Sequence, residues 1–154
     1  MQQYIGVKLI EARPMKLGEY NAYRGWSMPA DEDPETEGYL VSYPGSDRYE
    51  SWSPKAVFES AYFPLAKEDT ITEEDVLAFV PDVGGIQTAK LGAKTAVTQA
   101  RCLTGFEITE SAACVEPENY DQNKGTQIGL NRIKDQLFAH LGFVLQWARN
   151  GLNA

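Results

Sequence analysis

The chain has 154 residues, of which 43% are hydrophobic and 23% are charged, and its formal net charge at pH 7 is -8. This acidic balance argues against nonspecific binding to nucleic acid, which needs a basic surface that releases counterions, but it is compatible with a local cationic pocket for a small anion. No apolar run approaches the roughly 18 residues needed to span a bilayer, and the first residues lack the pattern of a signal peptide. We therefore expect a soluble, intracellular protein.

Residues 1–65 are predicted to form a small α+β module. Residues 4–11 alternate apolar and polar side chains like a strand, with Ile5, Val7 and Leu9 on one face. Residues 18–26 are bounded by glycines and indicate a short turn or helix. An acidic loop at residues 31–37 is followed by a strand at 38–44, a turn at 45–47 and a second strand that leads through Trp52.

A helix at residues 55–62 closes this first module. Ser53 is suited to the N-cap position and Pro54 to the first helical position. In so small a module the aromatic side chains are expected to supply most of the core. These aromatics are Tyr20, Tyr23, Trp26, Tyr39, Tyr43, Trp52, Phe58 and Tyr62.

A second module is predicted at residues 70–154, after a linker at residues 64–69. Thr72 and Asp75 have the spacing of a capping box, which predicts a helix that ends at Pro81. Short gaps with Gly92 and Gly105 separate three strand-like runs, so an antiparallel meander is predicted. The three runs are residues 86–90, 95–103 and 106–115.

A long amphipathic helix follows at residues 126–141, because Leu130, Ile133, Leu137 and Leu141 recur at helical spacing. Gly142 predicts its end, and the alternation over residues 143–147 predicts a last strand. The predicted fold class is therefore α+β, in two small modules. In the C-terminal one, an antiparallel meander sheet is packed by an N-terminal helix and by the long amphipathic helix.

The usual catalytic motifs are missing from this sequence. It contains no glycine-rich phosphate loop, no serine elbow and no paired histidine ligands. The two cysteines, Cys102 and Cys114, lie on predicted strands without metal-like spacing and are expected to be reduced thiols. The one histidine, His140, falls in the last predicted helical turn, where a structural role is favoured over general-base chemistry. We expect no enzymatic activity, no cofactor and no metal.

One stretch carries a family resemblance. It includes Gly105-Phe106, the run from Ser111 to Val115, Pro117-Glu118-Asn119-Tyr120-Asp121, Gly125 and the run from Leu141 to Leu145. With these motifs the second module resembles the gene-49-like or gene-66-like bacteriophage proteins. It departs from their pattern at Ala113, within the Ser-Ala-Cys step, and near Phe138, where the family often carries Trp. The first module resembles a small phage module without a defined activity.

This resemblance implies a function by analogy. Some phage proteins that look like the second module are anti-Thoeris sponges, which capture cyclic ADP-ribose-type signals, or related cyclic nucleotides, without chemistry. The resemblance thus implies a protein of the infected bacterium's cytoplasm that binds a small nucleotide signal and blocks host defence, including cyclic-oligonucleotide (anti-CBASS) signalling. A homo-oligomer whose pocket joins adjacent chains is the expected assembly, with neither nucleic acid nor membrane as a partner.

Nine residues are the candidate ligand-binding set. Arg132, Lys134 and Lys124 would bind phosphate, although each is also typical of a solvated surface. The amide and carboxylate of Asn119 and Asp121 would bond ribose hydroxyls or cap the following helix. Rings suited to stacking on a base, or to the core, are those of Phe106 and Tyr120. The last two, Glu110 and Ser111, would bond an exocyclic amine or a hydroxyl, or serve strand pairing.

Two other functions stay open. One is a host-takeover or virion-associated interaction module without a small ligand, in which the aromatic-rich first module is the contact surface and residues 31–37 meet a basic partner. The other is a hydrolase that uses Asp121, Glu110 or Glu118. A carboxylate cluster without histidine, metal spacing or a nucleophile rarely makes a catalyst, so hydrolysis is the weakest of the three.

Overall fold

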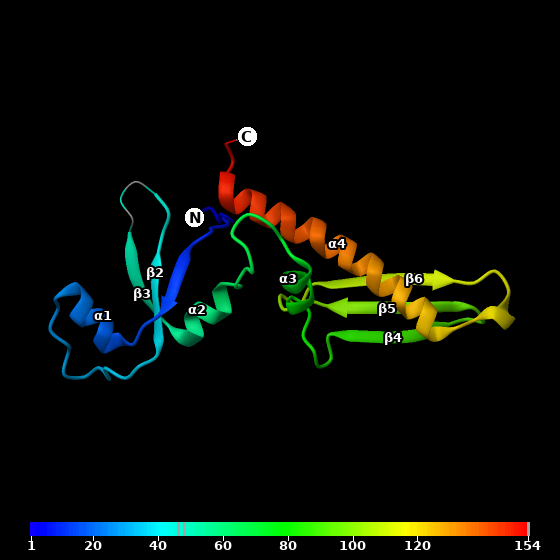
Figure 1. Cartoon of the computed structure of the whole chain (residues 1–154), viewed down its shortest axis with the longest axis horizontal. Coiled ribbons are helices and arrows are strands. Elements are labelled where there is room, and N and C mark those ends of the chain that lie inside the picture. The colour runs from blue at the N-terminus through cyan, green and yellow to red at the C-terminus, as the bar shows by residue number, and fades with distance from the viewer. Residues whose placement is uncertain (46, 48, 154) are drawn as a thin grey trace. The chain divides into compact units, whose positions relative to one another are not determined.

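A computed structural model describes residues 1–153 except 46 and 48, so the middle of the predicted turn at 45–47 lies outside the described residues. The chain forms two compact units (Figure 1). One comprises Met1–Pro64 and the last residues from Trp147 onward, and the other is Leu65–Gln146. Each unit contains a three-stranded antiparallel sheet and helices, so the α+β fold class is confirmed.

The first unit is a meander of β1 (Glu11–Pro14), β2 (Gly38–Ser42) and β3 (Glu50–Pro54), with α1 (Leu17–Arg24) between β1 and β2 and α2 (Lys55–Ala61) after β3. The strand predicted at residues 4–11 is wrong, since β1 begins only at Glu11. The register explains the difference. Glu11 already lies opposite Ser42, the last residue of β2, so earlier residues have no strand left to pair with.

The core of the first unit combines aromatic and aliphatic side chains. Its buried cluster is Met15, Tyr20 and Leu40, with Trp52 packed against it. The Trp52 indole donates a hydrogen bond of 2.8 Å to the Met15 carbonyl. Tyr23 and Trp26 are instead more than half exposed. The prediction is therefore wrong for Tyr23 and Trp26, whereas Tyr20 and Trp52 do belong to this core.

The acidic segment, residues 31–37, caps both helices of this unit through its backbone. In α1 the Leu17 N–H donates to the Thr36 carbonyl at 3.0 Å, and the Gly18 N–H donates to the Pro34 carbonyl at 3.0 Å. In α2 the first N–H, that of Lys55, donates to the Glu37 carbonyl at 3.1 Å. The Glu37 carbonyl thus satisfies a free donor of α2. The N-cap residue of α2 is Pro54 and not the predicted Ser53, and the helix begins at Lys55.

The second unit contains the predicted helix and three predicted strands. They are α3 (Glu73–Ala78), β4 (Ile86–Leu91), β5 (Thr95–Arg101) and β6 (Glu107–Ala113). The Thr72–Asp75 capping box is confirmed: the Asp75 N–H donates to the Thr72 hydroxyl at 3.2 Å, and the Thr72 N–H donates to the Asp75 carboxylate at 2.7 Å. The sheet order β4-β5-β6 is the predicted antiparallel meander.

A short 3-10 helix, η1 (Pro117–Asn119), leads into α4 (Gln122–Asn150), which is 29 residues long. The predicted end at Gly142 and the predicted strand at residues 143–147 are wrong. The apolar spacing that buries Ile133 and Leu137 continues to Leu145, which is also buried, so the helix runs on through Gly142. In the part of the chain that is described, no helix has the length and apolar character needed to cross a membrane.

Helix α4 packs against one face of the second sheet (Figure 1). Gly125 and Gly129 allow the close approach, because a Cβ on Gly125 would lie 2.3 Å from the Ala96 Cβ and one on Gly129 would lie 2.7 Å from the Thr98 hydroxyl oxygen. Farther along the helix a continuous core forms. Its buried members are Val76, Ala100, Cys102, Ile108, Ile133 and Leu137.

Candidate functional site

A pocket of about 190 Å³ lies where α4 begins, and we name it the α4 pocket. Its walls come from the ends of β5 and β6, from η1 and from the first turns of α4. Four of the nine candidate ligand residues line it: Asn119, Tyr120, Asp121 and Lys124. Lys94 and Ala96 line the same pocket, so residues as far apart in sequence as Lys94 and Lys124 lie around one cavity.

Asp121 has the capping role that was one of its two predicted alternatives. Its Oδ1 accepts a hydrogen bond of 3.0 Å from the Lys124 N–H, three residues into the helix. That geometry is typical of an aspartate at the N-cap. Asn119 ends η1 and is exposed, with its N–H donating to the Glu116 carbonyl at 3.0 Å. The Asn119 side chain is thus placed beside the cap without forming it.

Tyr120 is held in place at the pocket wall. Its hydroxyl donates to the Gln122 side-chain oxygen, and the Gln122 amide donates onward to the Thr126 hydroxyl at 3.0 Å. The Lys90 ammonium lies 4.2 Å from the centroid of the tyrosine ring, at cation–π distance. A planar ligand would therefore meet a ring of fixed orientation, one face of which is covered by a cation.

Three lysines lie at or beside the pocket in a protein of net charge -8. Lys94 donates from its ammonium to the Val115 carbonyl at 2.9 Å, so its charge is not neutralised by that contact. Sequence reasoning missed Lys90 and Lys94. Lys94 lies opposite Cys114, whose N–H donates to the Lys94 carbonyl at 3.1 Å. This pairing follows from the register of β5 and β6, so a correct prediction of that register would have placed Lys94 next to Cys114.

Cys114 is the pocket's sulfur-bearing residue. Its thiol is half-buried and lies 3.0 Å from the Glu116 carbonyl oxygen. Cys102 is buried in the core, and burial raises the pKa of its thiol. Both cysteines are free thiols. Among the described residues no group of three or more His, Cys, Asp or Glu side chains is placed to hold a metal ion.

The other five candidate residues lie outside the pocket lining. Arg132 donates to the Ser111 carbonyl at 2.6 Å and lies 4.0 Å from the Glu110 carboxylate, which also accepts from Gln136. Lys134 forms an ion pair of 2.6 Å with Glu73 of α3, which lowers the pKa of that carboxyl. Phe106 is 56% exposed, and its ring centroid lies 5.8 Å from that of His140.

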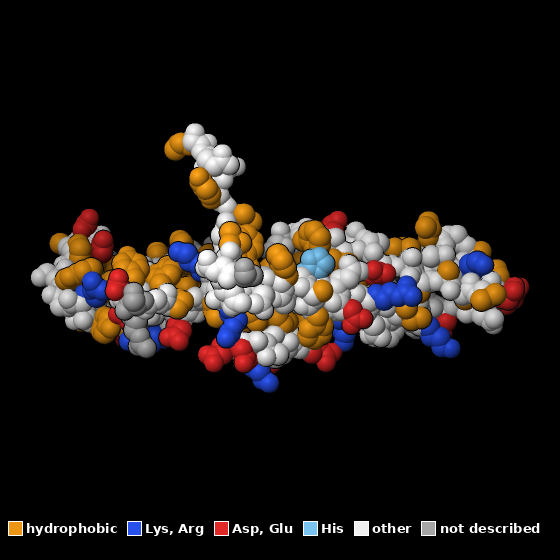
Figure 2. Space-filling model, turned by 90° about the horizontal axis from the view of Figure 1, so that it is seen from above, with side chains coloured by type: hydrophobic (Ala, Val, Ile, Leu, Met, Phe, Trp, Pro, Cys, Tyr) orange, Lys and Arg blue, Asp and Glu red, His pale blue; other side chains and the backbone are white. Residues whose placement is uncertain are grey.

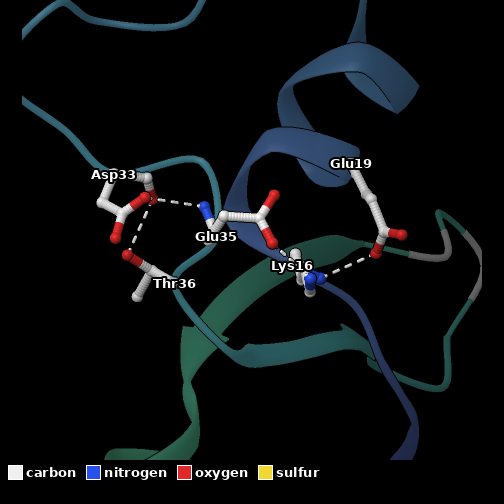
Figure 3. A network of polar contacts seen from close by, with 5 residues as sticks. All are labelled: Lys16, Glu19, Asp33, Glu35 and Thr36. Carbon is white, nitrogen blue, oxygen red and sulfur yellow. Dashed lines mark hydrogen bonds and ion pairs between the residues drawn. The ribbon is translucent and has the colours of Figure 1, made fainter.

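A larger pocket, of about 310 Å³, belongs to the first unit and is lined by Lys16, Glu19, Glu37, Tyr39 and Lys55 among others. Figure 3 shows the network beside it: Lys16 is paired with Glu35, the Lys16 N–H donates to Glu19 at 2.8 Å, and Asp33 accepts from Glu35 and Thr36. Lys55 is likewise paired with Glu37 at 2.8 Å. Both cations of this pocket are therefore neutralised by the acidic segment.

The same ion pairs bear on the prediction that the acidic segment meets a basic partner. The hydrogen bond that Lys16 donates to Glu35 raises the pKa of Lys16, and the one that Lys55 donates to Glu37 lowers the pKa of Glu37. Two of the segment's carboxylates thus act within the unit. Figure 2 shows Lys and Arg side chains interspersed with Asp and Glu side chains over the face in view, without a broad region of one sign.

Comparison with known proteins identifies one family. The profile described as "Phage protein (N4 Gp49/phage Sf6 gene 66) family" matches residues 59–148, which include α3, the second sheet, the α4 pocket and nearly all of α4. Searches of curated proteins and of solved structures each find no match. The match covers more than half of the chain and the whole candidate site, so the chain belongs to the N4 Gp49/phage Sf6 gene 66 family of phage proteins.

Proposed function

We propose that this phage protein is a non-enzymatic binding protein that sequesters a nucleotide-derived immune signal and so blocks host anti-phage defence. The ligand would be a cyclic ADP-ribose isomer or a cyclic di- or oligonucleotide. The observation that supports this proposal is the α4 pocket, where Asn119, Tyr120 and Lys124, chosen as ligand residues, line one cavity together with Lys94.

Each part of such a ligand has a chemically matched group at this pocket. Lys94 and Lys124 offer ammonium donors to phosphate, and the N-terminal end of α4 carries the positive end of the helix dipole. Asn119 can donate to and accept from ribose hydroxyls. Tyr120 offers a ring on which a base can stack. A site of this kind binds its ligand without needing a nucleophile or a general base.

The pocket volume limits how much of the ligand is enclosed. About 190 Å³ is below the range of roughly 300–1,000 Å³ found for sites that enclose drug-sized ligands. We therefore expect the phosphate and ribose of one nucleotide to enter, while the remainder lies over Tyr120 and Ile128 at the rim.

Isothermal titration with cyclic ADP-ribose isomers and with cyclic dinucleotides tests the proposal. We expect saturable binding to the wild-type protein, a loss of at least tenfold in affinity for Lys94→Ala with Lys124→Ala, and little change for Lys67→Ala, an exposed lysine of the same unit. Nucleotide recovered after denaturation should be chemically unchanged. Absence of heat with every nucleotide would overturn the proposal, and recovery of a hydrolysed product would replace sequestration by catalysis.

A second candidate function is an interaction module without a small ligand. One observation favours it: Tyr23 and Trp26 of the first unit are 53% and 54% exposed, and the Arg24 guanidinium lies 4.9 Å from the Trp26 ring. Trp, Tyr and Arg are the residues most enriched at interface hot spots. A host protein that is captured by the wild-type chain but not by Trp26→Ala would support this function over sequestration.

A further inference from the structure

The two edges of the second sheet differ in how they are protected. The Arg101 N–H donates to the Gly85 carbonyl, and the Cys102 N–H donates to the Phe106 carbonyl. Hydrogen-bonded pairs alternate along antiparallel strands. The register therefore determines which backbone groups point away from β5, toward the outside of the sheet. In β4 these are the N–H and C=O groups of Ile86, Thr88 and Lys90, and in β6 they are those of the odd-numbered residues.

The β6 edge is partly capped by α4. The outward carbonyl of Ser111 accepts a hydrogen bond of 2.6 Å from the Arg132 guanidinium. The side chain of Glu110, on the same strand, is held by Gln136 of the same helix. A strand that approached this edge would have to displace Arg132.

The β4 edge is open. All six residues of β4 are exposed, and the strand lies at the free side of its sheet (Figure 1). It contains neither proline nor an acidic residue, and its one charge is Lys90. Exposed edges of this kind are templates for pairing with another strand.

We propose that two copies of this chain pair their β4 strands antiparallel, about a two-fold axis at Thr88, to form a continuous six-stranded sheet. This register is self-complementary: Thr88 lies opposite Thr88 of the second copy, and Ile86 lies opposite Lys90. All three outward residues of each copy then exchange hydrogen bonds, and the lysines do not face each other. In this register a second copy sets no like charges opposite each other, so we take a second copy of the chain as the occupant.

On the opposite face of the sheet the same register sets Gln87 against Ala89 of the second copy. These are small or neutral contacts without like charges, which would be destabilising directly across a ladder. A single pair of six-residue strands is near the lower end of protein interface sizes. We therefore expect a concentration-dependent dimer with a dissociation constant on the order of micromolar.

A proline substitution separates this interface from the fold. Because the Thr88 N–H points outward, Thr88→Pro removes no hydrogen bond within the sheet and is tolerated at an edge. Sedimentation velocity over a range of concentrations should show a monomer–dimer equilibrium for the wild type, a monomer for Thr88→Pro, and unchanged dimerisation for the matched control Thr109→Pro on the β6 edge. Circular dichroism confirms that each variant is folded.

Disulfide trapping in the full-length chain tests the register and does not depend on the proline variant. Across the two-fold axis Thr88→Cys places its Cα atoms about 5.5 Å apart, within disulfide range, whereas Gln87→Cys places them roughly 7–8 Å apart, beyond it. We expect efficient cross-linking of the first variant and little of the second or of the wild type under the same oxidant. A wild-type chain that stays monomeric, or equal cross-linking of both variants, would overturn the proposal.

Discussion

At the contact between α4 and β5, the fit depends on individual atoms. Gly129 lies against Thr98, which has no exposed surface and whose hydroxyl is the buried side-chain polar atom without a hydrogen-bond partner among the described residues. Gly129 leaves space for the Thr98 hydroxyl, to which no described residue offers a hydrogen bond. Packing density, and not polar recognition, therefore stabilises this contact.

Alanine substitutions in α4 should have opposite effects at two glycines. Gly129→Ala adds a methyl group 2.7 Å from the Thr98 hydroxyl oxygen and should lower the free energy of unfolding by about 1–3 kcal/mol. Gly142→Ala meets nothing within 4 Å and should raise it by about 0.5–1 kcal/mol, because alanine loses less backbone entropy in a helix. Urea denaturation measures both, and a shared sign would contradict this account of the packing.

Thr98→Val should leave stability unchanged or raise it by up to about 1 kcal/mol. Valine keeps the shape of threonine and removes a buried hydroxyl that has no described partner. Thr98→Ala, which also deletes a methyl group and leaves a cavity, is the matched control and should destabilise the fold. A thermal or urea midpoint for Thr98→Val well below that of the wild type would show that the hydroxyl is satisfied.

At the scale of helices and strands, the sequence predicted correctly those features that depend on neighbouring residues. The Thr72–Asp75 capping box and the three strands of the second sheet depend on neighbouring residues and were predicted within a few positions. The strand predicted at residues 4–11 failed because pairing depends on where β2 ends. The end predicted at Gly142 failed because a glycine ends a helix only when the chain turns there, and burial of Leu145 favours continuation.

The candidate site was predictable in part for the same reason. Asn119, Tyr120, Asp121 and Lys124 are near neighbours in sequence, so one turn brings them together. Lys94 and Lys90 reach the site only through strand register, which a hydrophobic pattern does not specify. Arg132 and Lys134 were chosen for their charge, but their side chains contact Ser111 and Glu73 respectively.

The capping box of α3 should give the protein an acid-sensitive stability. Burial raises the pKa of the Asp75 carboxyl, but hydrogen bonds from the N–H groups of Thr72 and Ala66 and from the Thr72 hydroxyl outweigh it, and the net pKa is lowered. A carboxyl with a lowered pKa stabilises the fold above its unfolded-state pKa, about 3.9 for Asp, and this stabilisation is lost as pH falls through the folded-state pKa.

The free energy of unfolding should therefore fall below pH of about 4 in the wild type, and that decrease should be smaller in Asp75→Asn. The variant should also be less stable at neutral pH, since its amide cannot accept from all the donors around Asp75. Asp82→Asn, on an exposed residue of the same unit, is the control. Identical pH profiles for Asp75→Asn and the wild type would contradict the proposed role of the carboxylate.

At the scale of the whole molecule, the distribution of charge favours binding of a small anion over binding of a polyanion. The chain has 14 Lys and Arg against 22 Asp and Glu, and the face in Figure 2 shows the two signs interspersed. The three lysines at the α4 pocket form a local exception. A nucleotide with one or two phosphates can use such a site, whereas a nucleic acid also meets the rest of a protein whose net charge is -8.

The protein should accordingly not bind duplex DNA or RNA at physiological salt. Three lysines would neutralise about three phosphates, too few for stable binding when the remaining surface repels the strand. Fluorescence anisotropy with labelled duplexes should show no saturable signal, both for the wild type and for Lys94→Ala with Lys124→Ala, although the pair of substitutions should weaken nucleotide binding at least tenfold. Saturable binding that weakens steeply with salt and is lost in that variant would mean that the α4 pocket is part of a nucleic-acid surface.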